Sequence, residues 1–448
     1  MTENFFGTDG IRGKVGSYPI TPDFMLRLGW AIGHVFGKTS SGMVLIGKDT
    51  RVSGYMFESA LQAGLVSSGI DVALLGPMPT PGIAYLTRTL NASGGIVISA
   101  SHNPYYDNGV KFFSEFGTKL DAGLEAAISK SLEINMEIVA SDKIGKVTRV
   151  NDASGRYVEF CKSCFPSELN LRGLKIALDC AHGAAYQVAP KVFAELGAEV
   201  TSIGVEPDGY NINSSVGSTR PEALSALVIE SKSDLGIALD GDGDRLIMID
   251  RNGEVVDGDE ILYVIALSKL KKGTLEGGVV GTQMTNFGIE EAFKRLDVPF
   301  FRAPVGDRYV LEELMDHKWK LGGEASGHIL CLDLVSTGDA IVSSLQVLAG
   351  CLSLDKSLDQ IIKGLNKFPQ HIINVPYDGG FKVDPMETFS GAIREVESKI
   401  GEKGRVILRP SGTEPVIRVM VEGQDQSQVI DLAEQLAKFV ENECNKTV

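Results

Sequence analysis

Basic residues are in deficit in this chain of 448 residues, which has 43 Lys and Arg against 58 Asp and Glu and a formal net charge of −15. A negative charge of this size repels nucleic acids and anionic lipid surfaces at long range. Long apolar runs are missing as well, because the longest apolar stretches have the length of a strand or a buried helix rather than of a membrane span. The N-terminus also lacks a basic segment followed by an apolar one. We therefore expect no nucleic-acid partner, no membrane and a cytoplasmic location.

Cysteine is scarce too, with six residues in the chain, of which only Cys161 and Cys164 are close in sequence. No second CxxC pair and no neighbouring His pair completes a set of zinc ligands. Scattered cysteines are typical of a reducing compartment. The chain also has no Gly-x-Ser-x-Gly elbow, and the sequence GKT at 37–39 has Ile32 where a Walker loop requires Gly. A zinc site, an esterase-type triad and Walker-type nucleotide binding are therefore disfavoured.

Helical and strand patterns alternate through most of the chain, which predicts an α/β fold with mainly parallel sheets. A short apolar strand runs into a polar loop three times, and we expect a helix after each loop. The strands and loops are 95–98 with 99–104, 175–178 with 179–183, and 278–280 with 282–288. Ligands collect beyond the carboxyl ends of strands in such sheets, so these loops are the expected place of a site.

The end of the chain has a different pattern. Strands at 406–408 and 416–421, joined by a tight loop and followed by a closing helix, predict a small α+β unit. A chain of this length is expected to form about three domains, within a range of two to four. Boundaries are expected near Asn151, Val255 and Pro369.

The most specific motif is DGDGDR at 240–245, directly after an apolar strand at 235–239. Carboxylates at alternate positions can converge on one side, and the intervening glycines let the backbone turn tightly around an ion. An EF-hand is excluded, because Arg245 stands in place of its Gly and Arg251 in place of its final Glu. The alternative, an acidic turn in solvent, would leave clustered carboxylates that repel one another. Since hard oxygen ligands suit Mg²⁺ or Mn²⁺, we predict a divalent cation at Asp240, Asp242 and Asp244.

The second motif is SASHNP at 99–104, a loop that offers a hydroxyl, an imidazole and backbone amides together. Taken alone, Ser101 is typical of a turn residue. The predicted metal site changes this interpretation, because a hydroxyl and a divalent cation are parts that phosphoryl transfer uses. We therefore predict that Ser101 carries a phosphoryl group.

Two further motifs carry groups that suit a small phosphorylated ligand. The sequence RPSGTEP at 409–415, with Arg418 beyond it, combines guanidinium forks, hydroxyls and a glycine where backbone N–H groups can approach an anion. Its alternative interpretation is a simple hairpin turn. The sequence GEASGH at 323–328 places a carboxylate, a hydroxyl and an imidazole at alternate positions, which can bind sugar hydroxyls or an amine. It could equally be a polar strand edge.

In this order the four motifs resemble those of the α-D-phosphohexomutase superfamily, and the resemblance extends from FGTDGIRG at 6–13 to RPSGTEPVIR at 409–418. The long match at 98–113 and the sequence GDRYV at 306–310 favour the branch that acts on glucosamine phosphates. Ala325 departs from that branch, which often has a polar residue there. The resemblance implies three related α/β domains with mainly parallel mixed sheets and a smaller α+β domain around a central cleft, at 1–150, 151–254, 255–368 and 369–448.

The resemblance also implies a role for each motif residue. Ser101 would be the phosphoserine and would share one Mg²⁺ per chain with the three aspartates. Arg12, His102, Lys111 and Arg245 would lie beside the transferring group. The sugar would be held by Glu324, Ser326, His328, Asp307 and Arg308, and the phosphate that is not reacting by Arg409, Ser411, Gly412, Thr413 and Arg418.

The implied reaction interconverts glucosamine 6-phosphate and glucosamine 1-phosphate through phospho-Ser101 and a glucosamine 1,6-bisphosphate intermediate. Such a reaction supplies UDP-N-acetylglucosamine and cell-wall precursors, and the family also suggests a homodimer. Two alternatives stay open. One is a mutase acting on glucose or mannose phosphates, which shares nearly all of these residues. The other is a non-catalytic protein that binds or senses a sugar phosphate, which predicts no phosphate on Ser101.

Overall fold

The computed structural model describes residues 5–7, 10–39, 42–376, 385–401, 404–410 and 416–446. Within these residues the strands form four sheets, three of them mixed and one antiparallel. The chain divides into two compact units, Met1–Met284 with Pro299–Lys363, and Thr285–Val298 with Gly364–Val448. The mixed sheets belong to the first unit and the antiparallel sheet to the second. The predicted class, three α/β sheets and a smaller C-terminal α+β part, is confirmed.

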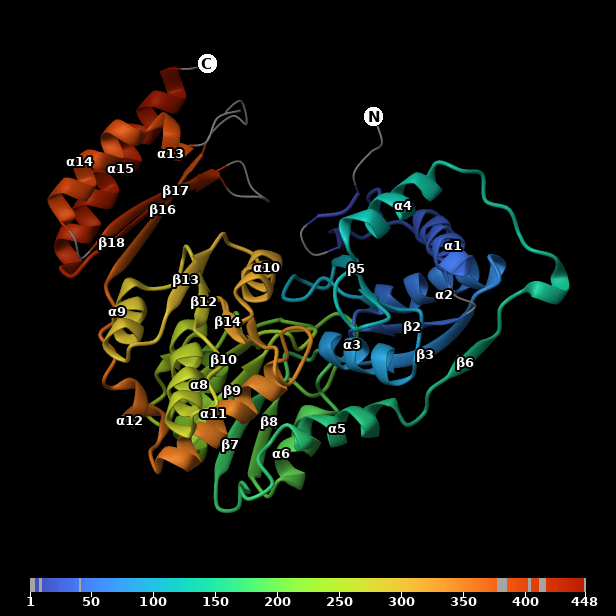
Figure 1. The fold of residues 1–448 in the computed structure, drawn as a ribbon, viewed down its shortest axis with the longest axis horizontal. Helices are drawn as coiled ribbons and strands as arrows, with labels where there is room; N and C mark the ends of the chain where they lie inside the picture. The colour runs from blue at the N-terminus through green and yellow to red at the C-terminus, as the bar shows by residue number, and fades with distance from the viewer. Residues whose placement is uncertain are drawn as a thin grey trace. The chain divides into compact units, whose positions relative to one another are not determined.

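The first sheet is the blue and teal part of Figure 1, with strand order β1-β5-β4-β2-β3-β6. Its strands are β1 (Ile11–Lys14), β2 (Met43–Lys48), β3 (Asp71–Pro77), β4 (Gly94–Ile98), β5 (Asp107–Ser114) and β6 (Val147–Arg149). The four strands β4, β2, β3 and β6 run parallel, whereas β5 and β1 are antiparallel to their neighbours. The sheet is therefore parallel at one side and antiparallel at the other.

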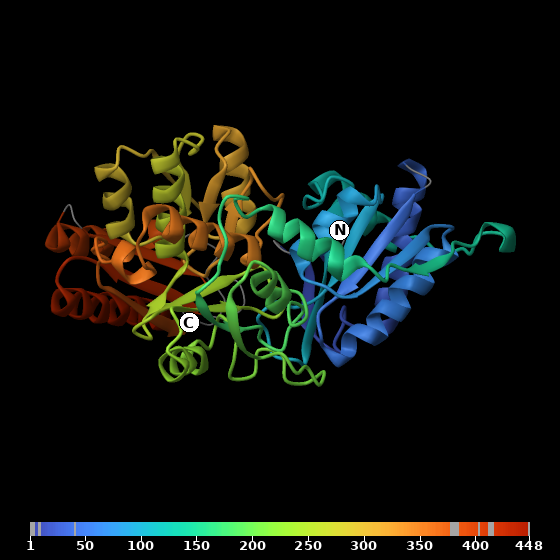
Figure 2. The ribbon, with the colours of Figure 1, turned by 90° about the horizontal axis from the view of Figure 1, so that it is seen from below.

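Helices cover both faces of this sheet, as Figure 2 shows from below. Val44 and Ile46 of β2 are fully buried in one core with α1 (Pro22–Thr39), α2 (Val52–Ser67) and α4 (Ala122–Leu132). Gly47 points the other way, where a side chain would meet Ile83 of α3 (Thr80–Thr89). The unbroken apolar run of β2 is explained by this burial on two sides.

The second and third sheets repeat this plan, with parallel strands followed by an antiparallel edge. The second has the order β11-β10-β9-β7-β8, with β7 (Lys175–Asp179), β8 (Glu199–Ile203), β9 (Leu235–Leu239), β10 (Leu246–Asp250) and β11 (Val255–Val256). The third has the order β13-β12-β14-β15, with β12 (Val279–Thr282), β13 (Phe300–Ala303), β14 (Leu321–Gly323) and β15 (Ile329–Cys331). The remaining helices of the first unit are α5 (Ala153–Ser163), α6 (Ala189–Glu195), α7 (Glu222–Ser231), α8 (Gly258–Lys272), α10 (Asp307–His317), α11 (Ala340–Leu354), α12 (Leu358–Ile362) and the short 3-10 helix η1 (Ser141–Lys143).

Three motif loops occupy the same place in these three sheets. Residues 99–106 join β4 to antiparallel β5, residues 240–245 join β9 to antiparallel β10, and residues 324–328 join β14 to antiparallel β15. The predicted helix after the loop at 99–104 is therefore wrong, because strand β5 follows it. The helices expected after 179–183 and 282–288 are present as α6 and α9 (Phe287–Arg295). Each of the three hairpin loops brings a polar motif to a strand end.

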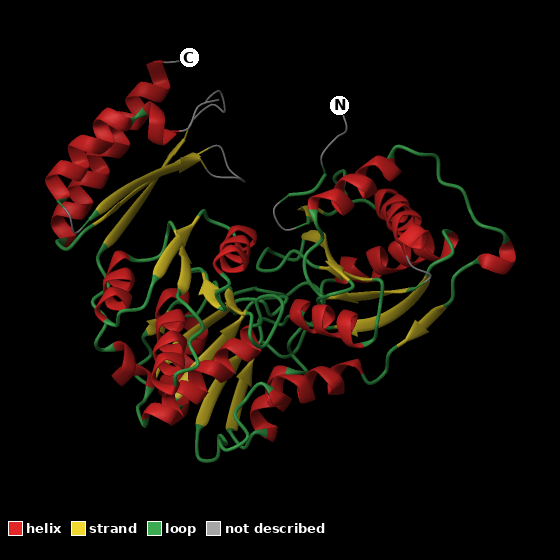
Figure 3. Cartoon of the chain, in the orientation of Figure 1, coloured by secondary structure: helices red, strands yellow, loops and turns green. Residues whose placement is uncertain are grey.

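The second unit contains an antiparallel sheet of order β16-β18-β17, which Figure 3 shows beside its helices. Its elements are β16 (Gln370–Pro376), β17 (Arg405–Pro410), β18 (Val416–Glu422), α9, α13 (Pro385–Thr388), α14 (Ser390–Ile400) and α15 (Gln426–Lys446). The two predicted strands are present and slightly longer than expected, and the predicted closing helix is present as α15. Val429, Leu432 and Leu436 of α15 are buried in this core, whereas Phe439 is 44% exposed. Of the helices that the structure describes, none combines the length and the apolar character needed to cross a bilayer.

Helices α1 and α2 cross closely enough that glycine is needed at the contact. A Cβ at Gly64 of α2 would lie 2.1 Å from the Leu26 carbonyl oxygen and 2.6 Å from the Trp30 nitrogen of α1. Backbone atoms cannot yield as a flexible side chain does, so an added methyl group must push the helices apart.

We predict that Gly64→Ala lowers the free energy of unfolding by about 1–3 kcal/mol, the usual effect of overpacking. The control is Gly155→Ala in α5, where an added Cβ meets nothing within 4 Å. That change should leave stability unchanged or raise it by up to about 1 kcal/mol, because alanine has the higher helix propensity. Urea denaturation of both variants measures the difference, and equal stabilities would contradict the proposed close contact.

Candidate active site

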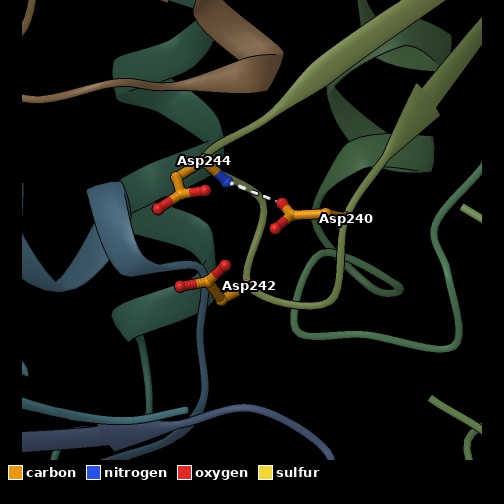
Figure 4. Close-up of side chains that lie close together, drawn as sticks. All are labelled: Asp240, Asp242 and Asp244. Carbon is orange, nitrogen blue, oxygen red and sulfur yellow. Dashed lines mark hydrogen bonds between the residues drawn. The ribbon is translucent and has the colours of Figure 1, made fainter. Parts of the chain in front are cut away.

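Three aspartates converge in the loop after β9, as Figure 4 shows. Asp240, Asp242 and Asp244 are buried, and each offers a carboxylate oxygen within 4.8 Å of the others. The loop is held by Oδ1 of Asp240, which accepts the backbone N–H groups of Gly243 (3.1 Å), Asp244 (3.2 Å) and Arg245 (3.1 Å). The turn at Gly243 has φ +74°, a conformation that glycine adopts without strain. The alternation of Asp and Gly thus lets the loop turn tightly, with Oδ1 of Asp240 accepting three of its backbone N–H groups.

The three aspartates place negative charge and hydrogen-bond acceptors close together in a buried loop. Burial and the neighbouring carboxylates of Asp242 and Asp244 raise the pKa of Asp240 well above its usual value. Within the described part of the chain, Oδ1 of Asp242 and Oδ1 of Asp244 are buried without a hydrogen-bond partner. Buried acceptors of this kind cost free energy unless a donor or a cation meets them. The donor set, oxygen only and anionic, fits a hard divalent cation such as Mg²⁺.

Ser101 meets this cluster from the first sheet. Its hydroxyl donates a hydrogen bond of 2.6 Å to Oδ2 of Asp240, and its Oγ lies 3.4 Å from Nδ1 of His102. The residue is 1% exposed and has φ +52°, a left-handed conformation that is uncommon for serine. A strained backbone at a polar strand end is typical of a functional position. The structure thus brings together the predicted nucleophile and the predicted metal ligands.

Basic side chains surround the carboxylates. Nζ of Lys111, on β5, lies 2.8 Å from Oδ2 of Asp242 and 3.1 Å from Oδ2 of Asp244. Nδ1 of His328, from the loop after β14, lies 3.8 Å from Oδ1 of Asp244. Burial lowers the pKa of His328, but the negative charges of the neighbouring Asp244, Asp307 and Glu324 carboxylates raise it to about 9. His328 is therefore protonated near pH 7.

His102 has the opposite electrostatic environment. Burial, with the positive charges of Arg245 and Arg12, lowers its pKa to about 4, so its imidazole is neutral near pH 7. Arg12 lies on β1, where it pairs with Gly109 of β5. Arg245 is half-buried, and the carboxylates of Asp244 and Asp240 raise its pKa against the opposing effect of burial. Arg12, His102 and Arg245 are thus close enough to interact electrostatically beside the Ser101 loop.

A cavity of about 290 Å³ opens next to this cluster. Its lining includes Lys111, Asp244, His328, Asp307 and Arg308, all of them predicted site residues. The cavity is therefore placed to receive a small ligand between the carboxylate loop and α10.

The other predicted sugar contacts have different surroundings. Oε1 of Glu324 accepts the backbone N–H of Gly306 (3.1 Å), which fixes the start of α10 to the loop after β14. The Ser326 side chain is exposed. Nε2 of His328 lies 3.7 Å from Oδ2 of Asp307. Glu324 and His328 thus connect the loop at 324–328 to the residues that begin α10.

The predicted phosphate loop belongs to the second unit. Arg409 of β17 and Arg418 of β18 are directly paired across the sheet. Side chains of directly paired residues stand on the same face about 5 Å apart, so two guanidinium groups concentrate positive charge there. Ser411, Gly412 and Thr413 lie outside the described residues.

Several site residues were not predicted. Thr80 donates its hydroxyl to Oδ2 of Asp242 (2.6 Å), and Lys119 forms a 2.6 Å ion pair with Asp307. The loop that carries Ser101 is also held by hydrogen bonds with three residues outside it, Asp49, Arg51 and Asn213. For Asp49 and Arg51 the sequence does offer a signal, because they lie in a polar run directly after the apolar strand β2, and polar residues at the carboxyl ends of strands indicate a site.

Four family models match the chain. They are described as phosphoglucomutase/phosphomannomutase α/β/α domain I at residues 3–138, domain II at 155–253, domain III at 257–368, and the C-terminal domain at 372–439. The matches cover most of the chain.

Relatives with more than half of their residues identical align with nearly the whole chain. Proteins named phosphoglucosamine mutase from Aeromonas hydrophila and Hahella chejuensis are 57% and 59% identical to it, each over 442 residues that cover 98% or more of both chains. Among solved structures, a putative phosphomannomutase from Thermus thermophilus has 25% identity and a TM-score of 0.79, and covers 98% of this chain and 100% of its own. An N-acetylphosphoglucosamine mutase from Aspergillus fumigatus, solved with GlcNAc-6P and magnesium, has 17% identity and a TM-score of 0.70, covers 98% and 96%, and shows a shared fold. This chain belongs to the phosphoglucomutase/phosphomannomutase family.

Proposed function

We propose that this protein is an isomerase that interconverts glucosamine 6-phosphate and glucosamine 1-phosphate by phosphoryl transfer through Ser101. One observation carries the proposal: the hydroxyl of Ser101 lies 2.6 Å from a buried aspartate of a three-carboxylate cluster, a nucleophile beside a set of metal ligands. The choice of sugar is supported by the relatives named phosphoglucosamine mutase, which are 57% and 59% identical over nearly the whole chain.

Phospho-Ser101 begins the reaction. The bond between phosphorus and Oγ of Ser101 breaks, a bond between phosphorus and O1 of glucosamine 6-phosphate forms, and the O1 proton passes to a base. The family offers Lys111 and His328 as candidates for this base, and each must first lose its own proton, since Lys111 pairs with two carboxylates and His328 is protonated near pH 7. The resulting glucosamine 1,6-bisphosphate turns round, its 6-phosphoryl group returns to Oγ, and O6 regains a proton. Glucosamine 1-phosphate and phospho-Ser101 remain.

Asp240, Asp242 and Asp244 would hold Mg²⁺ together with the seryl phosphate. The ion, when bound, neutralises charge on the transferring phosphoryl group. A seryl phosphate carries a charge of about −1.5 to −2 near pH 7. Lys111 and Arg245 are positioned to offset the additional negative charge, since both already interact with the aspartates.

The remaining predicted residues take supporting roles in this proposal. Arg12 and His102 lie beside the transferring group, and Glu324, Ser326, His328, Asp307 and Arg308 bind the sugar. The phosphate that is not reacting is bound by Arg409, Ser411, Gly412, Thr413 and Arg418. The cross-strand pairing of Arg409 with Arg418 supports that role.

The predicted domain boundaries and a homodimer are part of the same proposal. The boundaries at 150, 254 and 368 are supported by the spans of the four family models. The homodimer is a prediction from the family.

We predict that Ser101→Ala lowers turnover at least about 1,000-fold, because the side chain that carries the phosphoryl group is removed. Intact-mass measurement of the purified wild-type protein should show a phosphate adduct that phosphatase removes and that the variant lacks. Ser344→Ala is the matched control, since Ser344 is a buried serine whose hydroxyl bonds the Ile341 carbonyl oxygen within α11. Full activity in Ser101→Ala would refute the role of the serine.

We predict that Asp240→Asn abolishes activity but raises the thermal midpoint of the metal-free protein. The raised pKa of Asp240 means that the folded protein favours a neutral side chain there, and Asn supplies one of the same shape. Thermal unfolding in EDTA measures this effect, and added Mg²⁺ should stabilise the wild type but not Asp240→Asn. Asp250→Asn, a buried aspartate that accepts N–H groups of Asn252 and Glu254, is the control and should keep activity. A lower midpoint for Asp240→Asn would contradict the predicted repulsion.

We predict that kcat/KM for glucosamine 6-phosphate exceeds that for glucose 6-phosphate and mannose 6-phosphate at least about 100-fold, because a neutral 2-hydroxyl group cannot replace the charge and the N–H donors of the 2-ammonium group. The three sugars are compared on one preparation of known Ser101 phosphorylation. A preference for either neutral sugar would overturn the substrate assignment and leave the reaction class intact.

A further inference from the structure

Arg51 is a fully buried arginine directly beside the loop that carries Ser101. Its Nη2 donates to the carbonyl oxygens of Ser101 (3.0 Å) and Asn103 (2.8 Å), and its Nη1 donates to the carbonyl oxygen of Pro104. One guanidinium group thus binds three main-chain carbonyls within four residues. The planar fork of arginine suits such a pattern, whereas the single ammonium of lysine does not reproduce it.

Asp49 holds this arginine and also reaches the loop from the other side. Its Oδ2 accepts Nε of Arg51 (2.9 Å), and its Oδ1 accepts the Arg51 backbone N–H (2.9 Å). The same Oδ2 accepts the hydroxyl of Ser99 (2.6 Å), whose oxygen accepts the backbone N–H of Ser101 (2.9 Å). Both polar groups of the Ser101 main chain are therefore bonded, the N–H through Ser99 and the carbonyl through Arg51.

A third residue connects the loop to the second sheet. Nδ2 of Asn213 donates to the carbonyl oxygens of Ser101 (2.9 Å) and Asn103 (3.1 Å), the same two acceptors that Nη2 of Arg51 uses. The backbone N–H of Asn213 donates to the carbonyl of Ala181, in the loop after β7 (2.9 Å). Asp240 belongs to the sheet of β7 and β9, so Asn213 fixes the Ser101 loop to the part of the molecule that carries the metal ligands.

These contacts explain how Ser101 keeps its left-handed backbone. A serine at φ +52° is strained relative to ordinary conformations and persists only where its surroundings impose it. The bonds to the N–H and the carbonyl of Ser101 impose it here, and the same backbone directs Oγ toward Asp240. The hydrogen bonds of Arg51, Ser99 and Asn213 converge on the peptide groups of Ser101, so they fix the backbone of the proposed reacting residue itself.

We propose that Arg51, held by Asp49, is a positioning residue that fixes the main chain of Ser101 so that its phosphoryl group is aligned for transfer. Arg51 acts through the backbone and does not touch the substrate. The proposal rests on the proposed function, since it assigns Arg51 a part in that transfer. A displacement of about 1 Å can cost about 100-fold in rate, so a small loss of alignment is measurable.

The test is a single-turnover measurement on two variants, Arg51→Lys and Ser99→Ala. Protein whose Ser101 carries ¹⁸O-labelled phosphate is mixed with excess unlabelled hexose phosphate. Replacement of the labelled phosphoryl group by the unlabelled one is followed by intact mass and normalised to the phosphorylated fraction. We expect the transfer rate to fall about 100-fold in Arg51→Lys and about 10-fold in Ser99→Ala, which loses one hydrogen-bond link. KM should stay within about 2-fold, because neither side chain reaches the sugar.

Matched controls separate alignment from stability. Arg27→Lys replaces an arginine that donates to the Leu132 carbonyl, and Ser344→Ala replaces a buried serine of α11. Both should transfer phosphate at the wild-type rate. Thermal midpoints of all four variants show any loss of stability. If Arg51→Lys does not fold, Ser99→Ala decides, since it removes a single hydroxyl.

The outcomes are distinguishable from failure of the proposed function. Transfer is measured with whichever hexose phosphate the wild type consumes fastest, so a wrong choice of sugar does not affect the comparison. Wild-type protein that never carries phosphate on Ser101 would refute the proposed function. Normal transfer per phosphorylated molecule in both Arg51→Lys and Ser99→Ala, even with lowered thermal midpoints, would refute this inference alone.

Discussion

Repulsion among three buried carboxylates within 4.8 Å of one another is the constraint that organises this site. Such a cluster is tolerable only with positive charge nearby, and the chain supplies it from more than one element. Lys111 comes from the first sheet, Arg245 follows the aspartates, and His328 comes from the third sheet. Charge balance therefore brings β5 of the first sheet and the loop after β14 of the third sheet to the aspartates, and the Ser101 loop, which leads into β5, lies beside them as well.

The cluster of three aspartates could be predicted from the sequence because the whole signal lies within six residues after an apolar strand. The α/β class could be predicted for a similar reason, since apolar strands and amphipathic helices leave local patterns. The strand after the Ser101 loop was missed, because a polar loop at a strand end has the same local appearance whether a helix or an antiparallel strand follows. The role of that loop needed the family resemblance as well as its own residues.

Residues that support the loop from a distance left no comparable signal. Arg51 and Ser101 are 50 positions apart, and Asn213 and Ser101 are 112 apart, so no periodicity connects them. The pKa values of His102 and His328 likewise depend on surroundings that the sequence does not reveal. His102 beside Arg12 and Arg245 has a pKa of about 4, and His328 beside carboxylates has a pKa of about 9. One residue type is thus neutral at one position and protonated at the other, because of burial and charged neighbours that only the fold provides.

The equivalent hairpin loops of the three mixed sheets have a consequence for how such proteins can change. The path of a hairpin loop is set by the pairing of its flanking strands, so its side chains can be replaced without rebuilding the sheet. The same hairpin geometry thus carries the proposed nucleophile at 99–106, the carboxylate cluster at 240–245 and the proposed sugar contacts at 324–328. With the proposed roles, divergence can be modular: a new sugar preference would need changes in the third loop, while the other two loops stay as they are.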